Sequence, residues 1–158
     1  MEIDIDLSAQ RLRLCDGENR VMDVAVSTGA NGIGEQNGSG CTPRGRHQVR
    51  AKIGQGAPPG AVFRGRRWTG EVWTPEAHDT QPGRDWILTR ILWLSGLEPG
   101  RNRLGPVDTF RRYIYLHGTP PVTALGTPGS KGCIRMNNAD IIRLFDLVAP
   151  GTVVNLHE

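Results

Sequence analysis

The sequence has little of what marks membrane, metal-binding or disulfide-rich proteins. It contains no apolar run of about 18 or more residues, so we expect no membrane span. Its three cysteines are an odd number and none lies in a CxxC pair, which argues against a disulfide framework or a zinc site. A bridge between Cys15 and Cys41 stays open as an alternative. The N-terminus alternates acidic and apolar residues and lacks the basic region and apolar stretch of a secretory signal.

The sequence also lacks the signs of a nucleic-acid-binding or multidomain protein. No basic helix or nucleic-acid-binding module is visible, and the formal net charge is only +3. There are no repeats and no linker, so we expect a single domain over residues 1–158 that acts as a monomer. One run of basic residues could attract an acidic polymer or simply lie solvated on exposed strand faces. Its members are Arg44, Arg46, Arg50, Lys52, Arg64, Arg66 and Arg67.

Glycine and proline, by contrast, are abundant. The 21 glycines and 11 prolines favour many short strands and turns over long helices. Alternating apolar side chains, such as Ile3, Ile5 and Leu7, indicate half-buried strands. Asp16-Gly17 is typical of a hairpin turn, residues 29–46 predict a long exposed loop, and residues 54–60 predict another. We expect strands near residues 3–7, 12–14, 21–26, 47–53, 61–63, 71–74, 86–94, 111–117 and 152–156, with 86–94 central and buried.

One segment near the C-terminus has a helical pattern. Asn137 or Asn138 can cap its start, Asp140 lies in its first turn, and Pro150-Gly151 ends it. The apolar residues that recur at helical spacing are Ile141, Leu144, Phe145 and Val148. Together with the strands, this segment predicts a mostly β fold, a mixed and sandwich-like β-sheet with one or two short helices.

A histidine and a cysteine stand at the two ends of a loop in the last third of the chain. His117 ends the expected strand 111–117, and Cys133 follows a stretch that its glycines and Pro128 mark as a loop. A thiol reacts as the thiolate, and a neighbouring base or cation lowers its pKa from about 8.5 to roughly 3.5–7.5. A lone cysteine is more often a small buried apolar residue. If the loop folds back, however, this pair can carry out acyl transfer.

The residues around this pair resemble a known family, the L,D-transpeptidase catalytic domain, also called the YkuD domain. The C-terminal resemblance lies in His117-Gly118-Thr119, Leu125-Gly126 and Ser130-x-Gly132-Cys133-Ile134-Arg135-Met136. The N-terminal resemblance lies in residues 3–12, Val26-Ser27-Thr28-Gly29 and Thr42-Pro43-Arg44-Gly45. The sequence departs from the family at Lys131, where a histidine is usual.

The resemblance implies an enzyme of peptidoglycan synthesis that requires no cofactor and no metal. Cys133 would attack the stem-peptide carbonyl between a diamino acid at position three and the terminal D-Ala, which leaves a thioester. An amine of a second stem would then form a 3–3 crosslink, whereas attack by water would make the protein an L,D-carboxypeptidase. The resemblance places such an enzyme in the periplasm or cell envelope, and the lack of a visible signal leaves the cytoplasm open.

The resemblance also suggests roles for single residues. His117 would take the thiol proton and pass it to the leaving amine, with the Gly118 carbonyl fixing its tautomer. The backbone amides of Gly132 and Cys133 would form the oxyanion hole. The other residues would position the loop or bind substrate: Ser130 orients the loop, Lys131 adds positive charge near the thiol, Arg135 holds the loop or a substrate carboxylate, and Tyr115 shares the strand face of His117.

Two other functions stay open from the sequence, a non-catalytic peptidoglycan-binding domain, which Lys131 favours, and a general cysteine peptidase. Cys41 has no histidine close in sequence and is a poor candidate nucleophile. Structural or solvated roles are expected for the histidines that lack metal-ligand spacing, His47, His78 and His157. Packing in the core or in groove walls is favoured over sugar stacking for Trp68, Trp73, Trp86 and Trp93.

Overall fold

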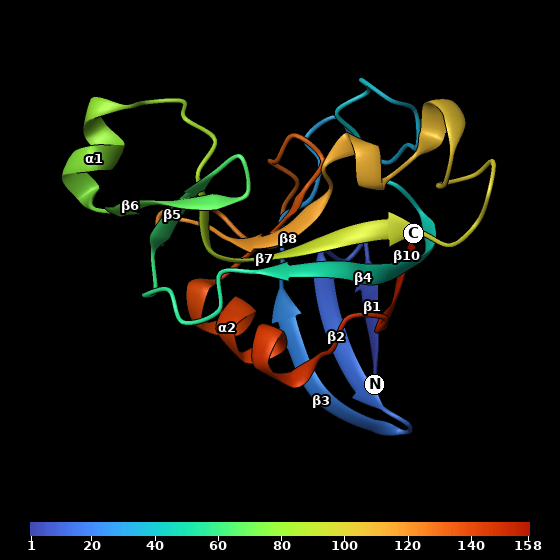
Figure 1. Ribbon diagram of the computed structural model, residues 1–158. Coiled ribbons are helices and arrows are strands. Elements are labelled where there is room, and N and C mark those ends of the chain that lie inside the picture. The colour runs from blue at the N-terminus through green and yellow to red at the C-terminus, as the bar shows by residue number, and fades with distance from the viewer.

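The computed structural model describes residues 1–158, which form one mixed β-sheet with two α-helices (Figure 1). The strands are β1 (Glu2–Asp6), β2 (Arg11–Asp16), β3 (Asn19–Ala25), β4 (Gly45–Ile53), β5 (Ala61–Arg64), β6 (Arg67–Val72), β7 (Ile87–Gly96), β8 (Tyr115–Gly118), β9 (Ile134–Met136) and β10 (Val153–His157). The helices are α1 (Pro75–Thr80) and α2 (Asn138–Leu147), and short 3-10 turns cover Gly105–Val107 and Phe110–Arg112. The prediction of a mostly β fold with a mixed sheet and one or two short helices is confirmed.

Strands that pair in this sheet are often distant in the sequence. The order is β3-β2-β1-β10-β4-β7-β5-β6, and β8 pairs with both β7 and β9. The pairs β1–β10 and β8–β9 are parallel, and the others are antiparallel. Parallel neighbours need a long crossover connection. Between β8 and β9 that connection is the loop of residues 119–133, which carries the candidate cysteine at its end.

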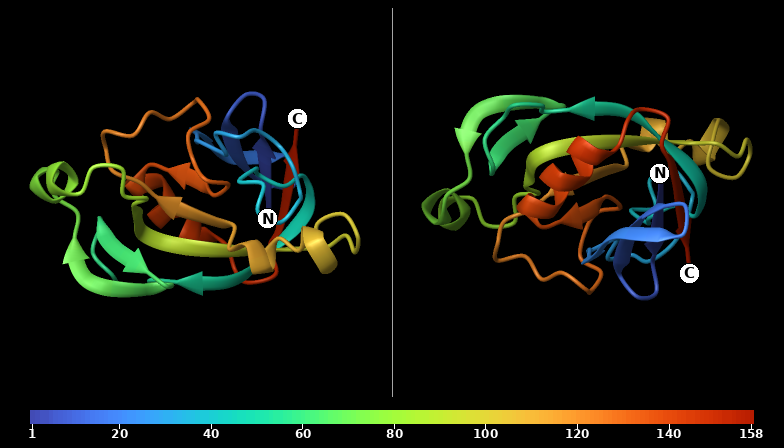
Figure 2. Two further views of the ribbon diagram at one scale, coloured as in Figure 1. Left: turned by 90° about the horizontal axis from the view of Figure 1, so that it is seen from above. Right: turned by 90° about the horizontal axis from the view of Figure 1, so that it is seen from below.

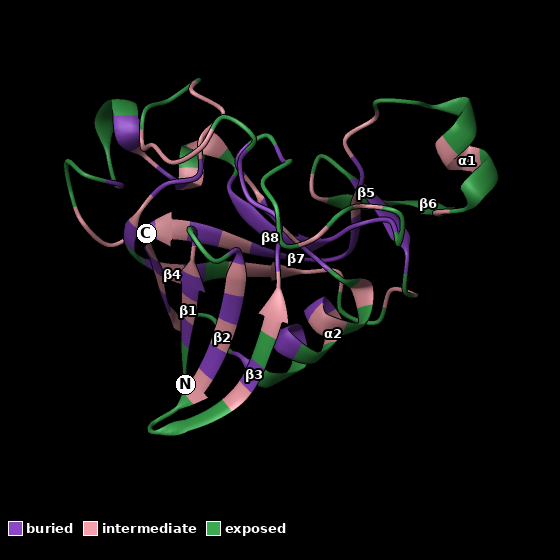
Figure 3. Ribbon diagram, turned by 180° about the vertical axis from the view of Figure 1, so that it is seen from behind, coloured by how far each residue is buried: buried purple, intermediate pink, exposed green.

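The main core lies where the curled sheet closes over α2. Its buried apolar side chains come from β1–β4, β7–β10, α2 and adjoining loop residues. Figure 3 shows how buried and partly buried residues alternate along β1 and β2. Ile3 and Ile5 point into this core, while Asp4 and Asp6 point away from it. The alternation in the sequence therefore identified the buried face of these strands correctly.

Helix α2 has the capping residue and the buried face that its sequence predicts. The Asn137 side chain accepts a hydrogen bond from the Ala139 N–H at 2.8 Å, and Ile141, Leu144 and Phe145 are buried. At the other end, the Lys52 ammonium donates to the carbonyls of Phe145 and Val148 at 2.6 and 2.7 Å. This positive charge stabilises the C-terminal end of the helix dipole, so Lys52 is no part of a free basic surface.

The chain ahead of β8 is not a strand, contrary to the prediction for residues 111–117. Phe110–Arg112 form a 3-10 turn, which ends when Tyr113 takes the left-handed conformation with φ of 56° and donates its N–H to the Phe110 carbonyl. Strand β8 starts at Tyr115, so Tyr113 is exposed and does not share the strand face of His117. The prediction was wrong because one left-handed residue interrupts an otherwise alternating pattern.

Three other sequence expectations also differ from the structure. The glycine-rich segment 29–46 is not exposed throughout, since Thr42 and Pro43 are buried and Gly45 begins β4. Strand β6 covers Arg67–Val72 and not residues 71–74. Helix α1 was not expected at its position, because it buries no residue and so has no apolar pattern to detect.

The loop between β8 and β9 lies between α1 and the β1–β3 strands, as both views of Figure 2 show. The β5–β6 hairpin and α1 extend from the opposite edge of the sheet to that of β3 (Figure 1). Neither α-helix is long and apolar enough to cross a membrane.

Candidate active site

The parallel pairing of β8 with β9 places His117 and Cys133 on one side of the sheet. Leu116 pairs with Ile134 and His117 with Arg135, so Cys133 lies opposite Tyr115. Because side chains alternate along a strand, Cys133 and His117 project from the same face, one diagonal step apart. On the other side of β8, the pairing of β7 shifts register between Leu88 and Ile91, next to His117. Such bulges re-aim side chains and are frequent beside active sites.

His117 is held as a neutral imidazole whose Nε2 can accept a proton. Its side chain is buried, and Nδ1 lies 2.6 Å from the carbonyl oxygen of Gly118. A carbonyl only accepts hydrogen bonds, so Nδ1 carries the hydrogen and the lone pair is on Nε2. Burial lowers the pKa of His117, and the Gly118 carbonyl and Asp85 oppose that effect more weakly. The ring therefore has the tautomer that a general base needs.

The thiol of Cys133 is held neutral by its surroundings. Sγ donates a hydrogen bond to the Tyr113 carbonyl at 3.3 Å and accepts one from the Tyr115 N–H at 3.3 Å. Burial raises the pKa of Cys133 to about 12, and the Asp85 charge adds to this; the Tyr115 N–H, Arg135 and Arg112 lower it by less. The expectation that cations bring this pKa below its ordinary value is therefore not met in the free protein, because burial outweighs the two arginines. No hydrogen bond joins Sγ to the His117 ring.

Two buried hydroxyls fix the turn that leads into Cys133. Ser130 Oγ donates to the Cys133 carbonyl at 2.5 Å and accepts the Gly132 N–H at 3.1 Å. Thr42 Oγ1 donates to the Gly132 carbonyl at 2.9 Å and accepts the Gly29 N–H at 2.8 Å. The Gly132 amide is thus already occupied, so of the two amides expected in the oxyanion hole only that of Cys133 is without an acceptor.

Gly132 has a conformation that other residues rarely adopt. Its φ is 122°, and a Cβ there would lie 3.1 Å from the Cys41 carbonyl oxygen and 3.3 Å from the Ile114 side chain. The glycine before the cysteine therefore lets the loop pack closely against the segment around Cys41.

Arg135 positions the loop in this structure. One guanidinium nitrogen donates to the Gly129 carbonyl at 3.0 Å, and another lies 3.0 Å from an Asp85 carboxylate oxygen. The backbone of Arg135 also exchanges hydrogen bonds with Ser27, of 3.0 and 2.8 Å. The N-terminal segments that contain Ser27 and Thr42 therefore stabilise the loop that carries Cys133. This contact could not be seen from the sequence, because the segments are far apart in it.

The two remaining predicted residues lie around a cavity of about 290 Å³ that contains Cys133. Tyr115 is buried there, and its hydroxyl accepts a hydrogen bond of 3.4 Å from Arg66. Lys131 is exposed on the rim, has no hydrogen-bonding or charged partner, and is not among the charges that shift the pKa of Cys133. A direct effect of Lys131 on the thiol therefore has no support in the structure.

Arg112 and Asp85 line this cavity and were missed from the sequence. Arg112 is half-buried and donates to the carbonyls of Gly34 and Cys41, at 3.2 and 2.5 Å. Arg112 thus ties the Gly-rich segment to the wall of the cavity. No sequence signal singled out either residue, because arginine and aspartate in loops are common and neither lies near Cys133 in sequence.

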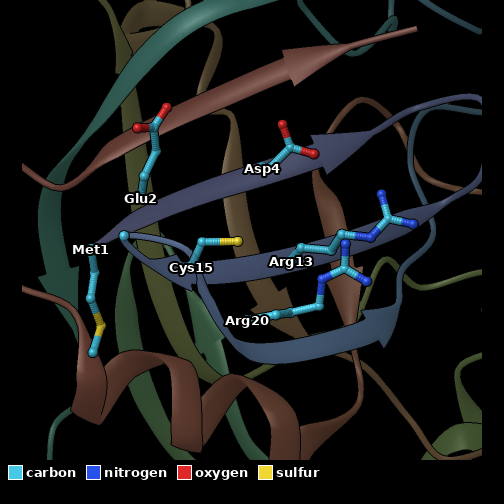
Figure 4. Close-up of a pocket in the computed structure, with 7 residues that line it drawn as sticks. Met1, Glu2, Asp4, Arg13, Cys15 and Arg20 are labelled. Carbon is cyan, nitrogen blue, oxygen red and sulfur yellow. The ribbon is translucent and has the colours of Figure 1, made fainter.

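The other cysteines lie outside this cavity, and all three thiols are unpaired, so the alternative Cys15–Cys41 bridge is absent. Cys15 lines a separate cavity of about 490 Å³ on the outer face of β1–β3 (Figure 4). The figure shows its side chain on β2 between Asp4 and Arg20. Cys41 makes only long contacts of its sulfur with the carbonyls of Asn31 and Ser39, at 3.5 and 3.7 Å.

The other candidate residues have structural contacts. His47 is buried, with its ring nitrogens 3.0 Å from the Gly45 carbonyl and 2.8 Å from Thr109 Oγ1, and His157 pairs with Asp4 at 2.9 Å. Of the basic run, Arg44 pairs with Glu35 and Glu158. Among the tryptophans, Trp86 is buried and Trp93 stacks on Phe110, whereas Trp68 is 46% exposed.

Comparisons with known proteins agree with this arrangement. The chain matches the model of the L,D-transpeptidase catalytic domain (YkuD) over residues 1–156. It is 37% identical over 62 residues to the YkuD protein of Bacillus subtilis (strain 168), an alignment that covers 36% of this chain and 38% of the relative.

Solved structures show the same fold. One is an L,D-transpeptidase from Mycobacterium smegmatis, with 18% identity and a TM-score of 0.57 over 99% of this chain and 58% of that one. Another is a cysteine-to-serine mutant of the Enterococcus faecium L,D-transpeptidase, with 16% identity and a TM-score of 0.59 over 99% of this chain and 49% of that one. This chain thus spans about half the length of those chains. By its match over nearly all its residues, the chain belongs to the L,D-transpeptidase catalytic domain family.

Proposed function

We propose that this protein is a peptidoglycan L,D-transpeptidase that forms 3–3 crosslinks through a thioester on Cys133. The observation that carries the proposal is the common strand face of Cys133 and His117, in which the base has its lone pair on Nε2 and the nucleophile lines a cavity. Family membership supplies the substrate class, peptidoglycan stem peptides. We place the enzyme in the periplasm or cell envelope, where these substrates occur, and expect it to act as a monomer.

In the first half-reaction the thiolate forms only as attack begins. His117 Nε2 takes the proton of Cys133, and Sγ bonds to the carbonyl carbon between the diamino acid and the terminal D-Ala. The Cys133 N–H donates to the developing oxyanion. The protonated His117 then gives its proton to the departing amine of D-Ala, and the thioester remains.

In the second half-reaction the amine of an acceptor stem attacks the thioester carbonyl. His117 takes a proton from that amine and returns it to the Cys133 sulfur as the C–S bond breaks, which restores the free enzyme. If water enters in place of the amine, the same steps release a tripeptide stem, and the enzyme is an L,D-carboxypeptidase. The products therefore distinguish the two activities.

Mass spectrometry of the products from a tetrapeptide stem, with and without an acceptor stem, tests this proposal. We expect a crosslinked product that has lost one D-Ala when the acceptor is present, and none with the Cys133→Ala protein. Cys41→Ser is the matched control and should retain activity, since Cys41 lies outside the cavity. Tripeptide alone would identify the carboxypeptidase, and no product from any stem would favour a non-catalytic binding domain.

A further inference from the structure

A second cavity, of about 360 Å³, adjoins the cavity that contains Cys133. It lies between the loop that follows β8 and the segment that joins α1 to β7, the two segments that Figure 2 shows side by side. Asp85 and Lys131 line both cavities. A peptide bound at Cys133 can therefore continue past these two residues into the second cavity.

The second cavity carries more positive than negative charge. Three permanent cations line it, Arg84, Lys131 and Arg135, against one carboxylate, Asp85. Asp85 and Arg135 neutralise each other through their 3.0 Å ion pair. The positive charges of Arg84 and Lys131 then remain available. The nearest carboxylate to Arg84 is that of the half-exposed Glu71, at the long distance of 3.9 Å, and Lys131 has no charged partner.

Arg84 is held in place by an aromatic ring and one hydrogen bond. Its guanidinium lies over the ring of the buried Trp86, 4.3 Å from the ring centre, and makes one hydrogen bond, of 2.7 Å, to the Gln81 side chain. The stacking fixes the plane of the guanidinium and leaves most of its N–H groups without an acceptor. The indole N–H of Trp86 also has no acceptor. Thr123 also lines the cavity and accepts a hydrogen bond from Thr119 at 2.9 Å, so its own hydroxyl hydrogen can be donated.

We propose that this second cavity is a subsite for a carboxylate of the stem peptide, bound by Arg84 and Lys131. The proposal rests on the proposed function, since the carboxylates are the anionic groups of a stem that reaches Cys133. Two of them are candidates, the terminal carboxylate of the leaving D-Ala and the side-chain carboxylate of the diamino acid. Lys131, which replaces the usual family histidine, thus contributes to substrate binding and not to thiol activation.

Calorimetric binding to the Cys133→Ala protein, which cannot turn the ligand over, tests this proposal. The ligands are three tetrapeptide stems, one with both carboxylates free, one amidated at the C-terminus and one amidated on the diamino acid side chain. We expect one amide to bind roughly tenfold or more weakly than the parent stem, as for loss of a charge-assisted hydrogen bond. The amide that weakens identifies the bound carboxylate.

Adding Arg84→Gln or Lys131→Met to the Cys133→Ala protein should weaken binding of the parent stem. It should also reduce the difference in affinity between the parent stem and that amide. Arg50→Gln is the matched control, because Arg50 also lies over an aromatic ring, Phe110 at 5.9 Å, but is exposed and outside the cavity. Thermal unfolding of each variant shows whether it folds, and Lys131→Met, being on the surface, is expected to.

Equal binding of the three stems would overturn the subsite alone. The subsite would also be overturned if the variants at Arg84 and Lys131 weakened binding of the amidated stem as much as binding of the parent stem. No binding of any stem would overturn the subsite together with the proposed function. If all three stems bind Cys133→Ala equally and the wild-type protein turns them over, the proposed function stands and only the subsite is removed.

Discussion

The hydroxyl of Thr42 is expected to be a main support of the loop that leads into Cys133. The substitution Thr42→Val removes this hydroxyl while nearly keeping the side-chain shape. In the structure this buried hydroxyl donates to the Gly132 carbonyl and accepts the Gly29 N–H. Valine leaves both backbone groups buried without a partner, at a cost of about 1–3 kcal/mol each. We therefore expect the free energy of unfolding to fall by about 2–6 kcal/mol, against a typical total of about 5–15 kcal/mol.

Urea unfolding at equilibrium measures this loss. With an m value of about 2 kcal/mol/M, the midpoint should fall by about 1–3 M. Thr152→Val is the matched control, because the Thr152 hydroxyl makes a single exposed hydrogen bond, of 2.7 Å to the Ala149 carbonyl, and its loss should cost under about 1 kcal/mol. Acylation by a stem peptide at low urea should also slow in Thr42→Val, since Gly132 directly precedes Cys133. A Thr42→Val protein as stable as the control would refute the reasoning.

Three further outcomes follow from the same contacts. Since burial raises the pKa of Cys133 to about 12, its alkylation by iodoacetamide, followed by peptide mass spectrometry, should be slow at pH 7 and still increase above pH 9; a plateau below pH 8 would contradict the neutral thiol. Burial lowers the pKa of His47 from 6.5 to about 4, so between these values the unfolded chain binds a proton that the folded chain does not, and stability falls as pH falls. His47→Gln should flatten that fall by up to about 1.4 kcal/mol per pH unit in urea titrations, and an unchanged slope would refute it. Lys52→Met should lower the free energy of unfolding by about 1–3 kcal/mol, because two carbonyls at the end of α2 lose a charged donor; the same unfolding curve as wild type would show that water replaces it.

Regular local patterns made much of the fold predictable. The alternation in residues 3–7 and the capped helical pattern after Asn137 both correspond to elements of the structure, since in each the buried side is visible as a period in the sequence. The sequence could not predict α1, which has no buried face, or the turn at Tyr113, where a single left-handed residue ends the strand pattern early.

The candidate site was predictable in its motif and not in its supports. The His117 and Cys133 segments have distinctive sequences, but Thr42, Ser27 and Arg112 reach the site through contacts between segments some 70–110 residues apart in sequence. The protonation state of the Cys133 thiol could not be predicted from the sequence either. It depends mainly on burial, whose effect on the pKa of Cys133 outweighs the opposite effects of the Tyr115 N–H and the nearby arginines.

The central claim is that Cys133 forms the acyl-enzyme, and trapping that intermediate tests it most directly. The protein is mixed with a tetrapeptide stem, quenched in acid within one turnover, digested and mapped by mass spectrometry. The account predicts a thioester on Cys133 whose mass is that of the stem less D-Ala, present in wild type and Cys41→Ser and absent from Cys133→Ala. A His117→Ala protein should form it far more slowly. An adduct on Cys15 or Cys41, or release of D-Ala by Cys133→Ala at the wild-type rate, would contradict the account.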